Sequence, residues 1–350
     1  MKLLILTQKI DKQDPILGFF HGWVLELSKK FEKVSVVCLQ EGDFNLPENV
    51  RIYSLGKKNK KLPVLSRTKY LANFYGYILG LHADYDAVFV HMNQEYILFG
   101  GLFWKIMGKN IYMWRNHHAG SLLTDIAAMY CDKVFCTSKY SYTAKYKKTI
   151  LMPVGVDLRR FTLPMNGEES RTKNSILFLG RIAETKNVHI FVEALGILKE
   201  RGTIFTADIY GDALTKDRSY REKLKTRASE LDLDRVLKFH EGVPNNKTPE
   251  IYSSHEIFVN LSSSGMYDKT IFEAFACDCV VVVSNDNLMG EIDLRFIIKE
   301  RTAKEVADIL QIAIGLTEVE KGVITSNNTK FTTKHSLETL VEKLQLEMKS

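Results

Sequence analysis

The sequence predicts an α/β fold made of two domains, each built on a parallel β-sheet. The chain has 350 residues, which is about twice the usual length of a single domain. Short apolar runs of strand length alternate along it with segments of helical periodicity, the pattern of parallel sheets flanked by helices. A polar stretch at 164–173 interrupts this alternation, which then restarts.

The expected strands form one group before the polar stretch and a second group after it. The first group comprises 3–7, 34–39, 88–91, 111–114, 134–137 and 150–153. The second comprises 176–180, 207–211, 237–240, 257–261, 280–283 and 296–298. We therefore expect a Rossmann-like N-terminal domain over 1–165 and a Rossmann-like C-terminal domain over 166–333, with their sheets facing each other across a cleft. The amphipathic pattern near the end of the chain predicts a C-terminal helix within 334–350 that can pack back on the N-terminal domain.

Composition and charge exclude several classes of protein. With 45% hydrophobic and 26% charged residues the chain is that of an ordinary folded protein. No apolar run approaches the roughly 18 to 20 residues that cross a bilayer, and 1–7 is too short for a signal peptide. The five cysteines form no CxxC pair, as expected of reduced core residues in a cytoplasmic protein. A net charge of +6 is too small to indicate nucleic-acid binding.

One basic and aromatic segment departs from this even distribution. Lys57, Lys58, Lys60 and Lys61 precede the aromatic-rich stretch 70–77. Such a segment can rest on an anionic membrane surface or bind an acidic acceptor. The alternative is a solvated loop that leads into a packed helix, so a peripheral contact with the cytoplasmic membrane face is one of two interpretations.

The segment 176–187 has the composition of a phosphate-binding turn. A strand-like run ends at Gly180, and Arg181 and Lys186 follow at the entrance to an expected helix over 188–199. Glycine allows the backbone to turn sharply, and both cations can reach a diphosphate at the helix N-terminus.

A second segment of the same kind lies at 261–285. A Ser/Gly loop enters a helix whose early turns hold Asp268, Lys269 and Glu273, and the apolar run 280–283 follows. Ligands of open α/β sheets lie beyond the carboxyl ends of the strands, where helix N-termini attract anions. We expect this segment to meet a phosphate, with Asp268 capping the helix and a carboxylate near the sugar hydroxyls.

Five motifs make the chain resemble the retaining GT-B glycosyltransferases of family 4. They stand in the family's order and spacing at 152–161, 178–186, 209–212, 239–243 and 271–276. The segment 14–21 looks like the family's donor and acceptor loop. The resemblance covers nearly the whole chain.

The resemblance implies a hexosyltransferase of the kind used in polysaccharide biosynthesis. Such an enzyme moves a hexose from a nucleoside-diphosphate sugar to a glycan or lipid-linked acceptor, with retention and without a metal or other cofactor. Arg181 and Lys186 would neutralise the departing diphosphate, and Glu273 would bind the ribose. We favour UDP over GDP as the nucleotide, although no side chain gives a physical reason. The implied donor-binding residues are Gly18, Gly180, Arg181, Lys186, Gly242, Val243, Gly265, Met266, Tyr267, Asp268, Lys269, Thr270 and Glu273.

Three histidines are candidates for the acceptor side. His117 and His118 follow the expected strand 111–114, and the resemblance places His117 beside the transferred sugar, where it can bind a hydroxyl or orient the acceptor. We take His117, Arg181 and Lys186 as the candidate catalytic residues. His21, His117 and His118 are the candidates for acceptor binding.

One position departs from the family's pattern of two acids separated by seven residues. The residue eight positions before Glu273 is Gly265, which has no side chain. Lys269 and the backbone N–H groups of 265–267 are expected to take over part of the missing contacts. The alternative for Lys269 is an exposed lysine in the first turn of the helix.

Other functions remain open. A GT-B sugar phosphorylase or epimerase would use phosphate or water in place of the acceptor, and Gly265 makes a catalytically degenerate nucleotide-sugar-binding protein plausible. An NAD-dependent enzyme would need Gly-x-Gly-x-x-Gly after the first strand, and 7–18 contains only Gly18. The pair Asp84 and Asp86 resembles the metal-binding Asp-x-Asp of other transferases but precedes a strand, so no metal site is expected.

Overall fold

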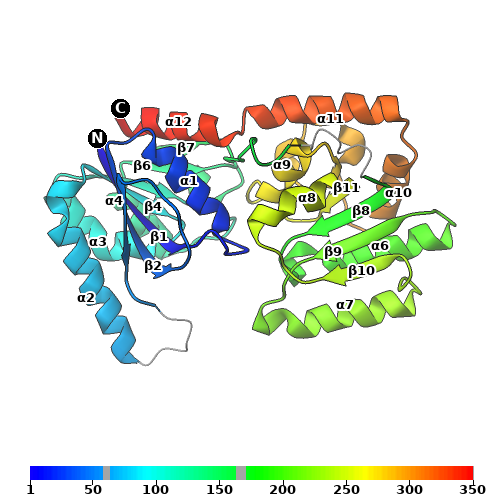
Figure 1. Cartoon of the computed structure of the whole chain (residues 1–350), viewed down its shortest axis with the longest axis horizontal. Coiled ribbons are helices and arrows are strands. Elements are labelled where there is room, and N and C mark those ends of the chain that lie inside the picture. Colours follow the sequence, from blue (N-terminus) through cyan, green and yellow to red (C-terminus); the bar gives the residue numbers. More distant parts are fainter. Residues whose placement is uncertain (58–63, 163–170, 350) are drawn as a thin grey trace. The chain divides into compact units, whose positions relative to one another are not determined.

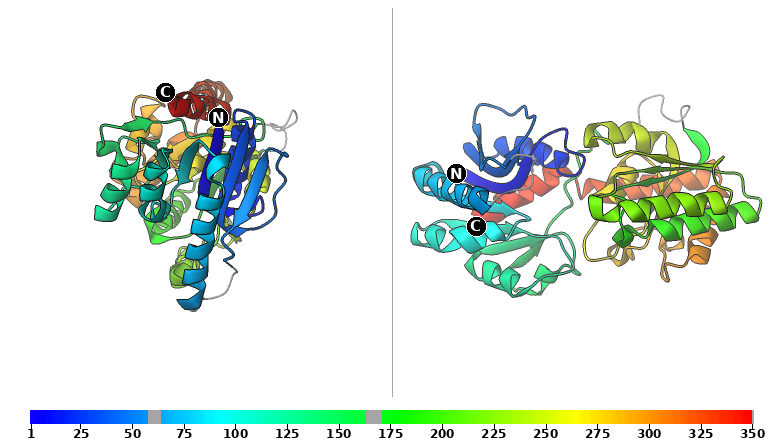
Figure 2. Two further views of the ribbon diagram at one scale, coloured as in Figure 1. Left: turned by 90° about the vertical axis from the view of Figure 1, so that its left-hand side faces the viewer. Right: turned by 90° about the horizontal axis from the view of Figure 1, so that it is seen from below.

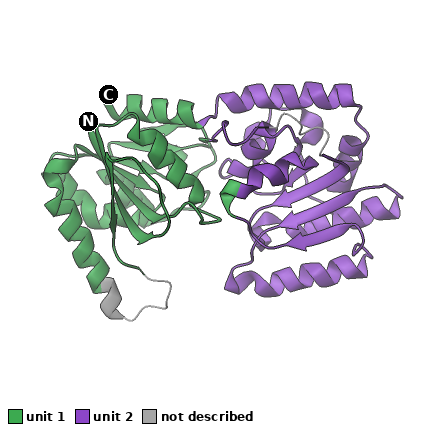
Figure 3. Cartoon of the chain, viewed as in Figure 1, with its two compact units in different colours: residues 1–155, 244–246, 337–350 green, residues 156–243, 247–336 purple. Residues whose placement is uncertain are grey.

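The computed structural model describes residues 1–57, 64–162 and 171–349 (Figure 1). These residues divide into two compact units, which we describe separately (Figure 3). The first unit contains 1–155, 244–246 and 337–350. The second unit contains 156–243 and 247–336. The expected class of two parallel-sheet α/β domains is confirmed.

The first unit is built on a parallel sheet of seven strands in the order β3-β2-β1-β4-β5-β6-β7. Its strands are β1 (Lys2–Ile10), β2 (Lys33–Glu41), β3 (Val50–Ser54), β4 (Ala87–His91), β5 (Asn110–Trp114), β6 (Lys133–Cys136) and β7 (Thr149–Leu151). Its helices are α1 (Gly18–Ser28), α2 (Val64–Gly80), α3 (Glu95–Ile106), α4 (Leu122–Tyr130) and α12 (Leu337–Lys349).

The helices of the first unit cover both faces of this sheet. On one face α1 and α12 lie side by side (Figure 1, Figure 2), and Trp23 shares a buried cluster with Leu340 and Leu344. The Tyr112 hydroxyl donates to the Met348 carbonyl at 2.9 Å. On the other face α2, α3 and α4 bury their inner sides against the strands, with Phe74 and Trp104 in one cluster.

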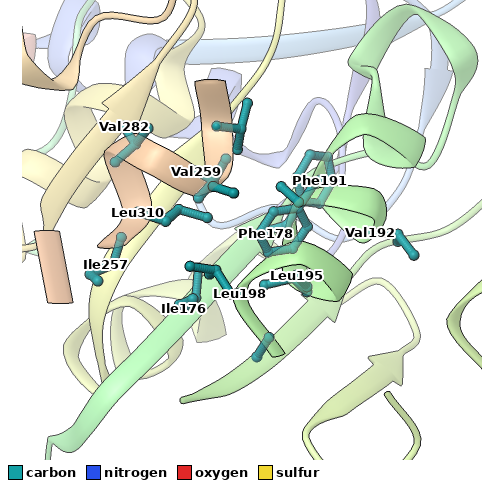
Figure 4. Close-up of a cluster of buried hydrophobic side chains, with 14 of the residues drawn as sticks. Ile176, Phe178, Phe191, Val192, Leu195, Leu198, Ile257, Val259, Val282 and Leu310 are labelled. Atoms are coloured by element: carbon teal, nitrogen blue, oxygen red, sulfur yellow. The ribbon is translucent and has the colours of Figure 1, made fainter. Parts of the chain in front are cut away.

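The second unit is built on a parallel sheet of five strands in the order β10-β9-β8-β11-β12. Its strands are β8 (Thr172–Leu179), β9 (Thr206–Tyr210), β10 (Leu237–His240), β11 (His255–Asn260) and β12 (Val280–Val283). Its helices are α6 (Val188–Glu200), α7 (Arg218–Glu230), α8 (Thr248–Ser253), α9 (Lys269–Ala276), α10 (Ala303–Ile314) and α11 (Glu318–Thr333). The core joins strands to helices: Phe178 of β8 and Val259 of β11 pack with Leu195 of α6 and Leu310 of α10 (Figure 4).

The boundary between the units lies at Gly155 and Val156 rather than at the expected 165/166. The Val156 N–H donates to the His335 carbonyl, and Phe161 packs against Tyr252. These contacts draw 156–162 into the second unit. The residues 334–336, expected in the C-terminal segment, belong to the second unit as well. Of the expected polar linker, 164–170 lies outside the described residues, and Thr172 and Lys173 already begin β8.

One strand was not predicted from the sequence, and one predicted strand does not form. The strand β3 was not expected, because none of its residues is fully buried and its sequence lacks an apolar run. Of the expected strand 296–298, Phe296 instead ends a 3₁₀ turn, Leu294–Phe296, which is capped by Asp293. Only an isolated bridge joins Ile297 to Val283, although 296–298 is buried as the apolar sequence predicts.

Candidate functional site

The candidate site begins at the carboxyl end of β8, where the chain turns towards α6. The Gly180 N–H donates to the Tyr210 carbonyl, and the Ile182 N–H donates to the Asp212 carbonyl. A Cβ atom on Gly211 would lie only 1.9 Å from the Gly180 carbonyl oxygen, so glycine is required for this close approach. The turns after β8 and β9 are thereby fastened to each other.

Lys186 connects the two phosphate-binding segments that the sequence predicts. It lies in a 3₁₀ turn, Glu184–Lys186, and its ammonium donates to Ser262 Oγ at 2.9 Å and to Asp268 Oδ2 at 2.5 Å. The next residue, Asn187, donates from its side chain to the Leu261 carbonyl at 2.9 Å. The turn before α6 is therefore held against the loop that precedes α9.

Asp268 occupies the expected N-cap position of α9, where its carboxylate accepts from the Thr270 N–H. The Thr270 hydroxyl also donates to it at 3.0 Å and in turn accepts from the Asn260 amide. Burial by itself raises the pKa of Asp268, but the Lys186 ammonium and these hydrogen bonds outweigh burial, so the pKa lies below its usual value. Asp268 is therefore ionised and neutralises part of the charge of Lys186.

Lys269 and Glu273 lie four residues apart on α9 and so share one helix face. Glu273 is 3% exposed and accepts from the Tyr252 hydroxyl at 3.1 Å. Burial lowers the pKa of Lys269 to about 8, while the carboxylates of Glu273 and Asp157 favour its charged form and Arg160 opposes it. Lys269 is thus a half-buried cation rather than the solvated lysine of the alternative interpretation.

The loop that contains Gly265 is held from the turn after β12. The Asn285 side chain donates to the Met266 carbonyl at 2.9 Å, and the Tyr267 hydroxyl donates to the Asn287 carbonyl at 2.9 Å. Gly265 is buried in this loop. The backbone path is therefore fixed at the place where the family pattern has its first acid.

The turn after β10 reaches the same edge of the sheet. The Gly242 N–H donates to Asp212 Oδ1 at 2.8 Å, and a Cβ atom on Gly242 would lie 2.5 Å from Asp212 Oδ2. Val243 follows Gly242 and is half-exposed. Arg181 is exposed, and no hydrogen bond or ion pair joins its guanidinium to another described residue.

The remaining candidates belong to the first unit. His117 follows β5, and its ring stacks on that of His118 with centroids 4.5 Å apart. His117 Nδ1 lies 3.0 Å from the Ala119 nitrogen, which donates to it. His21 Nε2 accepts from the Asn45 N–H at 3.1 Å, and Gly18 begins α1. Asp84 pairs with Lys33, and Asp86 accepts from the Lys2 N–H, so both acids of the Asp-x-Asp pair make structural contacts.

The structure adds residues that sequence reasoning did not name. Ser262 and Asn260 belong to the network around Lys186 and Asp268, while Tyr252 holds Glu273. The Asp157 carboxylate favours the charged form of Lys269. Its position within the motif 152–161 could have indicated from the sequence that it belongs to the site. Within the described ranges, no group of three or more His, Cys, Asp or Glu side chains could hold a metal ion.

Comparison with known proteins places this geometry in a known fold. The structure of Anabaena Alr3699/HepE in complex with UDP and glucose superposes with a TM-score of 0.79 over 100% of both chains, at 17% identity. The chain has the GT-B glycosyltransferase fold. Residues 162–321, which include most of the second unit, match the family model of glycosyl transferases group 1. A sucrose-phosphate synthase from Thermosynechococcus elongatus shares the GT-B fold with a TM-score of 0.74, 14% identity and coverage of 99% and 98%.

A curated relative adds a more distant sequence similarity. The chain is 25% identical over 170 residues to the UDP-N-acetylglucosamine–peptide N-acetylglucosaminyltransferase GtfA subunit of Streptococcus parasanguinis. That alignment covers 48% of this chain and 31% of the relative. The chain spans about a third of the length of the curated relatives that it matches. In the described part of the chain, no helix is both long and apolar enough to cross a membrane.

Proposed function

We propose that this protein is a hexosyltransferase that uses a nucleoside-diphosphate sugar and a glycan or lipid-linked acceptor. One observation carries the proposal. Within the segment that matches the group 1 model, Lys186 in the turn after β8 donates to Asp268, the N-cap residue of α9, and the same helix carries Glu273. Cations and free N–H groups at the carboxyl edge of a parallel sheet suit a diphosphate.

The proposed chemistry assigns a task to each of these groups. Arg181 and Lys186 stabilise the negative charge that develops on the departing diphosphate, which is usually the largest catalytic contribution. Glu273 accepts from the ribose hydroxyls. The acceptor oxygen bonds to the anomeric carbon on the face from which the diphosphate leaves, and the leaving oxygen takes the acceptor's proton. Configuration is then retained, and the two cations supply positive charge without a metal.

We further propose a UDP-sugar donor and a cytoplasmic location. HepE, which shares the fold, has been solved with UDP and glucose. All five cysteines are free and buried, as is usual for proteins of reducing compartments. Synthesis of a polysaccharide or of a lipid-linked glycan is the corresponding role.

A thermal-shift panel tests donor binding directly. UDP-, GDP-, ADP- and CMP-sugars are added in turn, and a ligand at 100 times its dissociation constant stabilises the protein by about 2.7 kcal/mol. We expect UDP-sugars to raise the melting temperature most. NMR of the product made with a suitable acceptor then reports the anomeric configuration. Absence of a shift with every nucleotide sugar contradicts the proposal.

A second candidate function is a nucleotide-sugar-binding protein without transfer activity. The observation that favours it is Gly265, which leaves the first acid of the family pattern without a side chain. Tight donor binding with neither transfer nor hydrolysis supports this candidate. A sugar phosphorylase is distinguished by turnover that depends on added inorganic phosphate.

A further inference from the structure

A cavity of about 220 Å³ in the second unit has no part in the proposed transfer reaction. It lies between the 3₁₀ turn Leu294–Phe296 and the helix α11. The turn contributes Arg295 and its capping residue Asp293, and α11 contributes the other residues that line the cavity. Pockets for drug-sized ligands have volumes of roughly 300–1,000 Å³, so this smaller cavity suits a single ring.

The cavity is separate from the sites that the sequence predicts. On α11, Thr329 donates to Asp278 Oδ1 at 3.0 Å, just before β12, and Lys321 donates to Glu256 Oε1 at 3.0 Å, near the start of β11. The cavity therefore flanks the amino ends of these strands, whereas the candidate donor site lies beyond their carboxyl ends. Of the basic segment predicted from the sequence, three lysines lie outside the described residues: Lys58, Lys60 and Lys61.

One residue that lines the cavity has a buried side-chain amide. Asn328 is 3% exposed, and no hydrogen bond joins its amide group to another described residue. Its backbone carbonyl, by contrast, accepts from the Thr332 hydroxyl at 2.8 Å. Buried polar side chains normally have a partner, because burial without a hydrogen bond is unfavourable. An asparagine amide both donates and accepts, so a ligand with one group of each kind would satisfy it.

The α11 side of the cavity also has apolar walls. Val319 and Val323 lie four residues apart on one face of the helix and are 78% and 59% exposed. Ile324 is 7% exposed and belongs to the core of the second unit. Ligand pockets commonly combine such apolar walls with a few polar groups that fix orientation. A ligand that has a methyl group next to an amide would fit both the valines and Asn328.

The charged side chains of the cavity disfavour an anionic ligand. Arg295 Nη2 donates to Asp293 Oδ2 at 2.7 Å and lowers the pKa of that carboxyl. Glu320 accepts from the Thr317 N–H at 2.9 Å and from its hydroxyl at 2.8 Å, and these bonds and the nearby Arg295 guanidinium lower the pKa of Glu320. One guanidinium against two carboxylates gives this lining a net charge of −1. A phosphate would be repelled, whereas hydroxyl groups can donate to the carboxylates.

We propose that this cavity binds a neutral sugar that carries an acetamido group. The acetamido N–H and carbonyl match the acceptor and donor of the Asn328 amide, and the methyl group packs against Val319 and Val323. The ring hydroxyls donate to the carboxylates of Asp293 and Glu320. A polypeptide amide offers the same donor and acceptor but no hydroxyl groups for these carboxylates. The cavity is then a glycan-binding site in addition to the proposed donor site.

Saturation-transfer NMR on the full chain tests this proposal without nucleotide or acceptor, so its outcome is independent of the proposed transferase activity. The probe is methyl N-acetyl-β-glucosaminide, and methyl β-glucoside is the control sugar without an acetamido group. We expect the acetamido methyl protons to receive the strongest saturation. The glucoside should bind about fivefold more weakly or worse, the effect of losing at least one hydrogen bond.

Three variants locate the binding. Asn328→Leu removes the amide at similar volume and should weaken binding of the acetamido sugar by about tenfold. It should fold at least as stably as the wild type, because the amide has no partner to lose in the described structure. Val323→Trp fills the cavity from an exposed position and should block binding. The control is Ile204→Trp, at a residue of the second unit that is 84% exposed and does not line the cavity, and it should bind like the wild type.

The proposal is overturned if the wild type shows no saturation transfer or if the glucoside binds as well as the acetamido sugar. It is also overturned if Asn328→Leu and Val323→Trp bind the acetamido sugar like the wild type. Saturation of N-acetylalanine methylamide in place of the sugar would assign the cavity to a polypeptide. UDP affinity should be the same in all three variants, so a failure of the proposed donor site would be recognised separately.

Discussion

The carboxyl edges of the two sheets are built in different ways. At the edge of the second sheet, side chains from distant segments hold one another: Lys186 bonds to Asp268 and Ser262, and Glu273 bonds to Tyr252. At the edge of the first sheet, distant segments are joined as well, since Asn116 accepts from the Thr137 N–H, but the candidate rings of His117 and His118 stack on each other and contact their own loop, with no ion pair to another described residue. A diphosphate site needs fixed charges, whereas an acceptor site can be completed by the acceptor itself. This difference agrees with the proposed roles, in which the second unit binds the donor with preformed charges and the first unit binds the acceptor.

Among the variants considered, Lys186→Ala should lower turnover the most. Removing a cation that faces developing charge costs about 10²- to 10³-fold in turnover, and Asp268 is left with a half-buried, unpaired carboxylate. Loss of a charged hydrogen bond of this kind also costs about 2 kcal/mol of unfolding free energy. Steady-state kinetics and chemical denaturation measure the two effects, with Lys223→Ala on α7 as the exposed-lysine control.

A double variant separates the two effects of that change. Lys186→Met combined with Asp268→Asn removes both charges together, so stability should recover while turnover stays low. Recovery of turnover in the double variant would mean that Lys186 acts only through Asp268 and does not meet the diphosphate.

Glu273→Gln should weaken nucleotide binding by about 10- to 100-fold, the effect of losing a charged hydrogen bond to the ribose. Glutamine retains an oxygen that can accept from Tyr252, so the fold should be preserved. Calorimetric titration with UDP measures the loss. The companion variant Tyr252→Phe removes only the support of Glu273, and we expect a smaller loss. Equal losses in both variants would assign Glu273 a structural task alone.

His117→Ala tests the proposed role of His117 on the acceptor side. We expect turnover to fall by about tenfold, the effect of one hydrogen bond to a sugar hydroxyl or acceptor, with UDP affinity unchanged. His82→Ala is the control, because its side chain is exposed and belongs to no candidate site. A variant at His117 that loses UDP affinity but turns over normally at saturation would contradict the acceptor-side assignment.

The sequence predicts local features of both edges well and long-range features poorly. Asp268 was expected as a helix cap because short acidic side chains favour that position, and the buried parallel strands were expected because they are continuous apolar runs. The contact between Lys186 and Asp268 joins residues 82 positions apart, and no local rule predicts it. The same holds for Tyr252, which reaches Glu273 from α8. The strand β3 escaped prediction because an edge strand with half-exposed residues lacks the apolar signal.

The smallest effect that we expect is a change of donor affinity with pH, caused by the titration of Lys269. The pKa of Lys269 is lowered to about 8, chiefly by burial. A bound diphosphate would favour its charged form, so binding takes up a proton above pH 8 and UDP affinity should fall severalfold between pH 7 and pH 9. Lys269→Arg keeps its charge throughout this range, so its affinity should stay nearly constant. A wild-type affinity that does not change with pH would remove Lys269 from the donor contacts.

The stability of the protein without nucleotide should change with pH in the direction opposite to nucleotide affinity, because of the same lysine. An unfolded lysine titrates near 10.4, so between pH 8 and about 10.4 the unfolded chain binds more protons than the folded one at Lys269. The titration of Lys269 should therefore raise the free energy of unfolding, and so stabilise the folded protein, as the pH rises through that window. Over the same window the affinity for the nucleotide falls. Denaturation of the wild type and of Lys269→Met across the window isolates that contribution. If the wild type and Lys269→Met show the same pH dependence of unfolding, the ammonium of Lys269 is as well solvated in the folded protein as in the unfolded chain. Lys269 would then not belong to the group of buried charges that includes Lys186 and Asp268.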